Sequence, residues 1–103
     1  MTVRRTKIIS TIGPASDTDD AVRALIAAGT DVFRLNFSHG THEQHRASAQ
    51  RIRRAAEEAG RVVALMQDLS GPKIRTGNLE GNQPIQLTEG EPLEIVIGDE
   101  LGR

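Results

Sequence analysis

Three short apolar segments, separated by two intervals with helical periodicity, constrain the fold of this chain more than any other feature. The apolar segments occupy residues 6–14, 31–37 and 61–69, and short connections separate them from the helical patterns. The first is rich in β-branched residues and predicts a short buried strand. Strands that alternate with helices in this way are joined by right-handed crossovers and run parallel. The sequence therefore predicts an α/β fold with the order β-α-β-α-β.

The first helical interval carries a start signal, an apolar face and a stop signal. Ser16 precedes an acidic residue by the spacing of a capping box, so we predict that Ser16 is the N-cap. Val22, Leu25 and Ile26 have the spacing of one buried helix face. Gly29 is predicted to end the helix in a left-handed conformation.

The second helical interval has the same organisation. "THEQ" at residues 41–44 is another capping-box candidate, and Gly60 is predicted to end the helix. The predicted inward-facing residues are Ala49, Ile52, Ala56 and Ala59. The segment that follows, residues 61–69, is almost continuously apolar, which predicts a strand covered on both faces.

The pattern changes after "GPKIRTG" at residues 71–77. A turn-rich stretch leads into residues 85–98, where apolar and polar residues alternate around Glu89 and Gly90. This alternation predicts an antiparallel hairpin with one solvated face, so we place a domain boundary near residue 76. Three parallel strands leave two unpaired edges, and an isolated hairpin is marginally stable. The sequence is therefore typical of the opening part of something larger.

Charge and composition exclude several classes of protein. The 103 residues include 13 Lys and Arg against 14 Asp and Glu, interspersed along the chain, which does not indicate a nucleic-acid partner. The absence of cysteine excludes a disulfide framework and a cysteine-ligated zinc site. No stretch approaches the roughly 18 to 20 apolar residues of a membrane-spanning helix, and no signal-peptide core is present. We therefore expect a cytoplasmic protein without membrane contacts.

Polar side chains gather where all three apolar segments end. The first ends in "STIGP", the second in "RLNFSHG" and the third in "QDLSGPKIR". Ligands of parallel α/β folds bind at the carboxyl ends of the strands, and neighbouring strands lie about 4.8 Å apart. Asn36, Ser38 and Asp68 are therefore expected to surround one small site, and their oxygens suit a hard cation.

Cationic groups accompany these oxygens. Arg34 offers a planar guanidinium to a phosphate or a carboxylate, which a lysine would not reproduce. His39 lies at the start of a helix, whose free N–H groups favour a nearby anion. Lys73 and Arg75 add positive charge next to Asp68. A cationic site with one carboxylate at this edge of the sheet fits the handling of a phosphate ester.

Structural interpretations of the same residues stay open. Arg34 can serve only to pair with a carboxylate on a neighbouring element. Asn36 and Ser38 are common residue types where a strand enters a loop. Histidines recur at every third position over residues 39–45, which is more typical of a solvated first helical turn than of a metal site. Asp68, at the end of an apolar strand, is the residue least easily explained as scaffold.

Three segments, "TKIISTIGPAS", "RLNFSHGTHE" and "DLSGPKIRTG", together resemble pyruvate kinase, which transfers a phosphoryl group from phosphoenolpyruvate to ADP. They occur in the family's order over nearly the whole chain. The resemblance implies that residues 1–75 are the N-terminal part of a (β/α)8 TIM barrel, with its first three strands and two helices. It implies that residues 76–103 are the beginning of an inserted β-rich cap domain, which is incomplete here.

The resemblance also assigns roles to single positions. Arg34 matches the substrate-binding arginine, which contacts the transferring phosphoryl group. The positions that match those near the nucleotide phosphates are Asn36, Phe37, Ser38, His39 and Arg75. The positions that match a monovalent-cation site are Asn36, Ser38, Asp68 and the backbone carbonyl of Leu69.

Two departures from the family's pattern concern its cofactors. Potassium-dependent members resemble "DTKGPEIRTG", whereas this chain has Leu69 where they have Thr and Lys73 where they have Glu. The Lys73 ammonium can supply the positive charge of K⁺, so we expect the oxygen ligands to persist without a K⁺ requirement. The family's Mg²⁺ ligands and its catalytic lysine lie on later barrel strands, outside this segment.

Three functions are considered for this chain. The leading interpretation is a segment of a glycolytic pyruvate kinase that takes phosphoenolpyruvate and ADP or ATP. Such an enzyme is expected to form a homotetramer when full length, and the isolated chain to be inactive. One alternative is a non-catalytic module that binds phosphate or nucleotides or serves in interactions. Another is a related barrel lyase acting on phosphoenolpyruvate-like acids, which would not need the cap insertion after "GPKIRTG".

Overall fold

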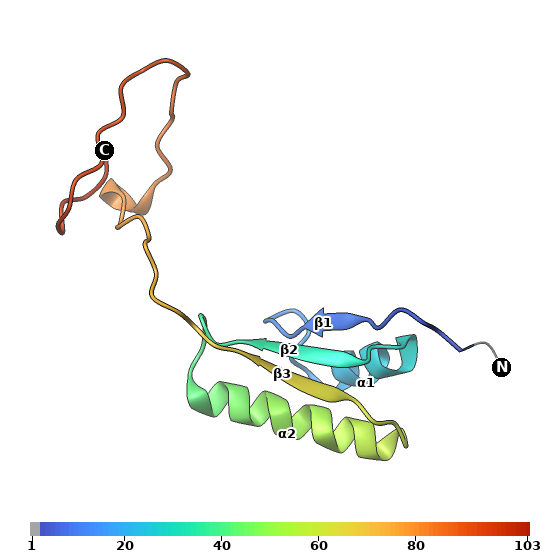
Figure 1. The fold of residues 1–103 in the computed structure, drawn as a ribbon. Helices are drawn as coiled ribbons and strands as arrows, with labels where there is room; N and C mark the ends of the chain where they lie inside the picture. Colours follow the sequence, from blue (N-terminus) through green and yellow to red (C-terminus); the bar gives the residue numbers. More distant parts are fainter. Residues whose placement is uncertain (1–2) are drawn as a thin grey trace. The chain divides into compact units, whose positions relative to one another are not determined.

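Three parallel strands, which pair in the order of the chain, form the sheet of the first unit, and two helices connect them (Figure 1). The computed structural model describes residues 3–103, which divide between Gly71 and Pro72 into two compact units. The elements of the first unit are β1 (Ile9–Thr11), α1 (Asp19–Ala28), β2 (Val32–Asn36), α2 (His42–Glu58) and β3 (Ala64–Asp68). The predicted order β-α-β-α-β is confirmed. No helix described within residues 3–103 combines the length and the apolar character needed to traverse a bilayer.

Both helices pack on the same face of the sheet, where β2 supplies the centre of the core. Phe33 and Leu35 alternate with more exposed residues along β2 and are buried against the helices. The buried apolar helix residues are Val22 and Ile26 of α1 and Ile52, Ala55 and Ala56 of α2. The apolar face predicted for α1 is thus confirmed. The remaining side chains of β2, including Arg34, belong to the opposite sheet face, on which none of the described elements of this unit packs.

The outer strands are more exposed than the sequence predicts. The prediction of a buried strand over residues 6–14 is wrong, because β1 is a three-residue edge strand in which Ile9 is 54% exposed. The prediction that the third strand is covered on both faces is also wrong. Leu65 packs against the core, whereas its neighbour Met66 is 39% exposed. Only the face that meets the helices is covered.

Helix α1 begins at Thr18, which corrects the N-cap predicted at Ser16. The Thr18 side chain accepts a hydrogen bond from Ala21 N at 3.2 Å. Ser16 Oγ instead accepts one from Gly13 N at 3.0 Å, in the turn after β1. A hydroxyl that is bound within this turn cannot cap the helix. The predicted end of α1 is confirmed, because Gly29 is left-handed with a φ of 111°.

Helix α2 has the predicted capping box at its start. Thr41 Oγ1 accepts a hydrogen bond from Gln44 N at 3.2 Å, and Gln44 Oε1 accepts one from Thr41 N at 2.8 Å. These two bonds satisfy backbone N–H groups that the first turn leaves without helical partners. The residue predicted to end the helix, Gly60, has a φ of 62° and follows the C-cap.

The inward-facing stripe predicted for α2 is correct only in part. Ile52 and Ala56 are buried, and Ala49 packs at the margin of the core. Ala59 is exposed because it is the C-cap, beyond the last helical residue. The two buried residues that the prediction omits are Ser48 and Ala55.

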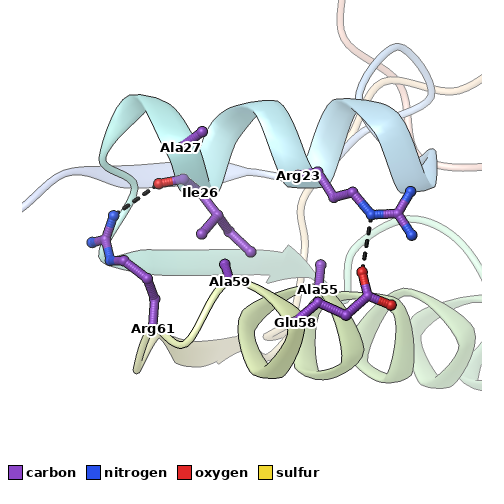
Figure 2. A pocket seen from close by; sticks show the side chains of 7 residues that line it. All are labelled: Arg23, Ile26, Ala27, Ala55, Glu58, Ala59 and Arg61. Carbon is purple, nitrogen blue, oxygen red and sulfur yellow. Dashed lines mark hydrogen bonds and ion pairs between the residues drawn. The ribbon is translucent and has the colours of Figure 1, made fainter.

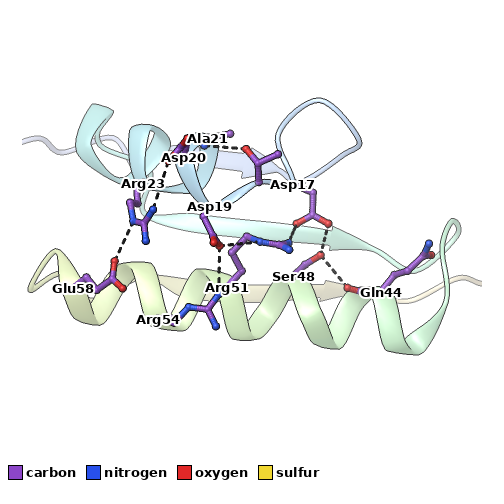
Figure 3. Close-up of polar contacts among 11 residues, drawn as sticks. Asp17, Asp19, Asp20, Ala21, Arg23, Gln44, Ser48, Arg51, Arg54 and Glu58 are labelled. Carbon is purple, nitrogen blue, oxygen red and sulfur yellow. Dashed lines mark hydrogen bonds and ion pairs between the residues drawn. The ribbon is translucent and has the colours of Figure 1, made fainter.

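Charged side chains join the loop after β1 and the start of α1 to α2 (Figure 3). Arg51 contacts the carboxylates of both Asp17 and Asp19, the latter at 3.2 Å. Arg54 adds a contact with Asp19 at 3.3 Å. Asp17 also accepts a hydrogen bond from the buried Ser48 Oγ at 2.8 Å. A single exposed ion pair contributes only about 0–1 kcal/mol, but this network reaches a buried hydroxyl and fixes the loop after β1 against α2.

The second unit, Pro72–Arg103, contains little regular structure. A 3-10 helix spans Glu80–Asn82, and one isolated parallel bridge joins Leu79 to Gly102. The division between Gly71 and Pro72 lies a few residues before the boundary predicted from composition. The assignment of the two parts to a barrel domain and a cap domain stays a prediction.

The hairpin predicted within the second unit is wrong. No strand forms over residues 85–98, all of which the structure describes. A turn does form at the predicted place, where Glu91 N donates to Thr88 O at 3.2 Å. The apolar residues on either side are uncovered, and Ile95 is 89% exposed. Alternating apolar residues yield a stable strand pair only where another surface covers them, which explains the difference.

The segment before β1 is fastened to the start of β2 through Asp31. The Asp31 carboxylate accepts a hydrogen bond from Ile8 N at 2.8 Å and one from Arg4 Nη2 at 3.3 Å. The backbone hydrogen bond from Ile8, and after it the charge of Arg4, hold the pKa of Asp31 below its ordinary value of 3.8. Both contacts therefore favour the charged carboxylate.

We expect Asp31→Asn to lower the melting temperature of the protein that carries this segment at neutral pH. A carboxyl group with a depressed folded pKa stabilises the fold above its unfolded pKa, and this contribution is lost as pH falls through the folded pKa. The difference between variant and unmodified protein should therefore shrink below pH 3.8. Melting curves by circular dichroism at several pH values check this. Asp20→Asn is the control, because the Asp20 side chain is fully exposed; an equal effect there would contradict the prediction.

Candidate functional site

Arg34 connects the carboxyl ends of all three strands on the sheet face without helices. Its Nε donates to Asp68 Oδ2 of β3 at 2.9 Å, and its Nη2 contacts the same oxygen. Its Nη1 donates to Thr11 Oγ1 of β1 at 3.3 Å. The strand register explains both contacts. Arg34 lies directly opposite Thr11 of β1 and Met66 of β3, and Asp68 follows Met66 by two residues.

The pairing with Asp68 does not use the whole guanidinium of Arg34. Three of the five N–H donors of an arginine are engaged here, which leaves two. The side chains of Arg34 and Asp68 are 31% and 45% exposed, so both can be reached from solvent. The ion pair holds the guanidinium plane in place, and the two remaining donors can bind an anion.

The residues after β2 form a turn that is fastened to the end of β3. Asn36 Oδ1 accepts a hydrogen bond from Ser38 N at 3.0 Å, and Asn36 O accepts one from His39 N at 3.2 Å. Phe37 N donates to Asp68 O at 2.9 Å. Asn36 and Asp68 are also direct neighbours in the strand register. The structure thus brings Asn36 and Asp68 together, with Ser38 in the turn that follows.

The oxygen atoms at this edge are of the kinds that a hard cation prefers. Asn36, Ser38 and Asp68 offer an amide, a hydroxyl and a carboxylate oxygen, and the carbonyl of the exposed Leu69 follows in the chain. Both contacts from Arg34 go to Oδ2 of Asp68, so Oδ1 is not engaged by this arginine. The donor types therefore suit a hard cation. Within residues 3–103, no group of three or more His, Cys, Asp or Glu side chains is arranged to hold a metal ion.

Lys73 and Arg75 are not among the residues that the structure brings together. Both belong to the second unit, which is described by itself. Charge support by Lys73 and contact of Arg75 with a nucleotide therefore stay predictions.

A cleft of about 680 Å³ opens between the loop after β1 and the start of α2, and it is lined by Thr11 and Asn36 from the ends of β1 and β2. The residues that shape it include Thr11 and Gly13, the predicted site residues Asn36 and His39, and Gln44 and His45 of α2. Sequence reasoning included the first strand end but assigned no role to Thr11, although the rule of strand ends applies to it equally. It also missed His45 as a cleft residue, because no sequence signal shows how the first turn of α2 faces the loop.

A second hollow, of about 420 Å³, lies between the two helices near the end of α1 (Figure 2). Arg23 Nε donates to Glu58 at 3.1 Å, and Arg61 Nη1 donates to the backbone oxygen of Ile26 at 2.8 Å. The charged side chains around this hollow are thus paired with protein groups. None of the predicted site residues lines it, and we therefore assign the candidate site to the cleft at the strand ends.

Comparisons with known proteins agree on one family. The family model described as "Pyruvate kinase, barrel domain" matches residues 3–103. Pyruvate kinase of Geobacillus stearothermophilus is 50% identical over 99 residues, which are 96% of this chain and 17% of that protein. Pyruvate kinase of Mycobacterium tuberculosis is 46% identical over 95 residues, which are 92% of this chain and 20% of that protein.

A solved structure gives the same result. The crystal structure of Cryptosporidium parvum pyruvate kinase is 48% identical in sequence and superimposes with a TM-score of 0.69. The match covers 82% of this chain and 18% of that one. The chain thus spans about a fifth of the length of the relatives that it matches.

Proposed function

This chain belongs to the pyruvate kinase family, and from that premise we propose that it supplies part of a site that transfers phosphoryl between phosphoenolpyruvate and ADP. The observation that carries the proposal is the bridge from Arg34 to Asp68 and Thr11 at the carboxyl ends of the strands. This cationic group has two remaining donors, and its partner Thr11 also lines the open cleft. The products of the forward reaction are pyruvate and ATP.

In the proposed mechanism, Arg34 binds the phosphoryl group during transfer. Phosphoryl transfer depends mostly on positioning and on neutralisation of charge, and a guanidinium held by Asp68 and Thr11 supplies both. The nucleotide would lie along the turn after β2, next to the positive end of α2. The residues proposed to approach its phosphates are Asn36, Phe37, Ser38, His39 and Arg75.

The proposal includes cations that the family uses. Asn36, Ser38, Asp68 and the Leu69 carbonyl would hold a monovalent cation, which contributes positive charge near the phosphoryl oxygens. We propose that the ammonium of Lys73 replaces this charge, so that K⁺ is not required. The ligands of Mg²⁺ would come from outside this segment.

The remaining parts of the proposal concern the whole protein. A (β/α)8 site draws residues from several strands, and the three strands described here leave one sheet face without a helix. We therefore propose that this segment acts within a longer chain and is inactive alone. A homotetramer in the cytoplasm is proposed on the basis of the family alone.

A direct assay tests this function. The polypeptide that carries this segment in its source cells is purified, its intact mass is measured, and pyruvate formation from phosphoenolpyruvate is followed with and without ADP and Mg²⁺. We expect a mass several times that of the 103-residue chain, and pyruvate formation that requires ADP and yields ATP. Turnover of phosphoenolpyruvate without ADP would favour a lyase. Nucleotide binding without turnover would favour a non-catalytic module.

A further inference from the structure

His45 of α2 holds the loop that carries His39. The ring nitrogen Nε2 of His45 lies 2.6 Å from the backbone oxygen of His39. A carbonyl oxygen can only accept a hydrogen bond, so His45 must carry a proton on Nε2 and donate it. One side chain of the helix thus fixes the backbone of a loop residue that lines the cleft.

A second contact joins the same ring to the loop. The ring of Phe37 stacks on that of His45, with centroids 4.2 Å apart and an interplanar angle of 13°. Both side chains are partly buried. His45 therefore binds the loop on both sides of Ser38, through an aromatic face at Phe37 and a hydrogen bond at His39.

Gly40 shows how closely the loop and the helix approach. Its φ is 76°, a conformation that favours glycine. A Cβ atom at this position would lie 3.1 Å from Gln44 Oε1 and 3.3 Å from His45 Nε2. The first turn of α2 is thus packed tightly against the loop.

We propose that His45 is a positioning residue for ADP, which acts by holding His39 in place at the cleft. This inference rests on the proposed function, in which the turn after β2 approaches the nucleotide. His45 itself is separate from the cluster of Arg34, Asp68 and Thr11. Its loss should therefore weaken ADP binding and leave the binding of phosphoenolpyruvate unchanged.

His45→Ala in the full-length protein tests the inference through the two Michaelis constants. We expect the KM for ADP to rise about tenfold, as for the loss of one hydrogen bond and one aromatic contact, with the KM for phosphoenolpyruvate within about twofold. His42→Ala is the matched control. His42 lies one turn earlier on α2, and its ring is tilted against Phe37 at a centroid distance of 5.9 Å. That variant loses only this longer contact and no hydrogen bond to the loop, so its KM for ADP should rise by less than about twofold.

Two further variants separate the contacts and guard against misfolding. His45→Gln retains a donor without the ring, and His45→Phe retains the ring without a donor. Each should raise the KM for ADP by less than His45→Ala does. Circular dichroism spectra and melting temperatures establish that each variant is folded.

Direct titration of ADP without phosphoenolpyruvate distinguishes failure of this inference from failure of the proposed function. Weaker ADP binding by His45→Ala supports the inference even if the unmodified protein shows no turnover, in which case only the proposed catalysis is wrong. If His45→Ala binds ADP as tightly as His42→Ala, the inference is overturned and the proposed function stands. If the unmodified protein does not bind ADP, both are overturned. An equal rise in both Michaelis constants would also overturn the inference, because it would indicate a general structural role.

Discussion

Arg34→Lys is expected to lower kcat/KM for phosphoenolpyruvate by roughly a hundredfold to a thousandfold in the full-length protein. The guanidinium of Arg34 is held by Asp68 and Thr11 through three of its five donors, and the proposal assigns the other two to the phosphoryl group. The loss of one preorganised donor at a developing charge has an effect of this size. A coupled assay of pyruvate formation over a range of phosphoenolpyruvate concentrations measures it.

The substitution keeps the positive charge, so the expected loss of kcat/KM reports the contribution of the guanidinium's shape and not of its charge. An ammonium carries its three donors on one atom, so it cannot span Asp68, Thr11 and a phosphoryl oxygen as the planar fork of a guanidinium does. The lysine should pair with Asp68 and leave the phosphoryl group without its planar partner. The effect should therefore appear in kcat as well as in KM.

Arg23→Lys is the matched control for this prediction. Arg23 also donates to a carboxylate, that of Glu58, at 3.1 Å, but it lies at the hollow between the helices, away from the strand ends. Its replacement should leave kcat/KM within about twofold, since an exposed ion pair contributes about 0–1 kcal/mol. Near-normal activity of Arg34→Lys, or an equal loss in both variants, would contradict the assigned role of Arg34.

The order of elements could be predicted because each depends on local patterns. Val22, Leu25 and Ile26 identify a helix face from spacing alone, and Thr41 with Gln44 identifies a helix start. The choice between Ser16 and Thr18 as N-cap could not be made in the same way. It depends on the turn after β1, which engages the Ser16 hydroxyl, and both residues are good caps by type.

Predictions that depended on what covers a surface were the ones that failed. The alternating residues 85–98 and the apolar run that contains Met66 carry valid strand patterns. Burial, however, is a property of the partner surface, and the described part of the chain supplies none for Ile95 or for the outer face of Met66. A strand pattern therefore predicted β3 correctly and residues 85–98 incorrectly, because only β3 has a neighbouring strand with which to pair.

The candidate site could likewise be predicted only in part. That Arg34, Asn36 and Asp68 share one edge follows from the rule of strand ends, which needs no register. That Arg34 pairs with Asp68 follows only from the register, in which Asn36 is the direct neighbour of Asp68. The contacts of His45 with Phe37 and His39 depend on the rotation of α2 about its axis, for which the sequence carries no signal.

Lys73→Glu is expected to make the full-length protein depend on K⁺. Lys73 follows Asp68 by five positions, and the proposal assigns to its ammonium the charge that a monovalent cation supplies elsewhere in the family. The proposal places this ammonium near the phosphoryl group, so its replacement by a carboxylate would change the charge there by two units. A change of two unit charges in a partly screened site corresponds to roughly a hundredfold in rate.

Activity is measured in tetramethylammonium chloride and in KCl at equal ionic strength. The activity of the unmodified protein should differ by less than about twofold between the two salts. The activity of Lys73→Glu should be roughly a hundredfold lower without K⁺, and KCl should restore part of it. The oxygens of Asn36, Ser38 and Asp68 then bind the ion that the ammonium had replaced. Lys7→Glu carries the same charge reversal in the segment before β1 and should not respond to K⁺. Strong K⁺ activation of the unmodified protein, or none in Lys73→Glu, would show that Lys73 does not take the place of the cation.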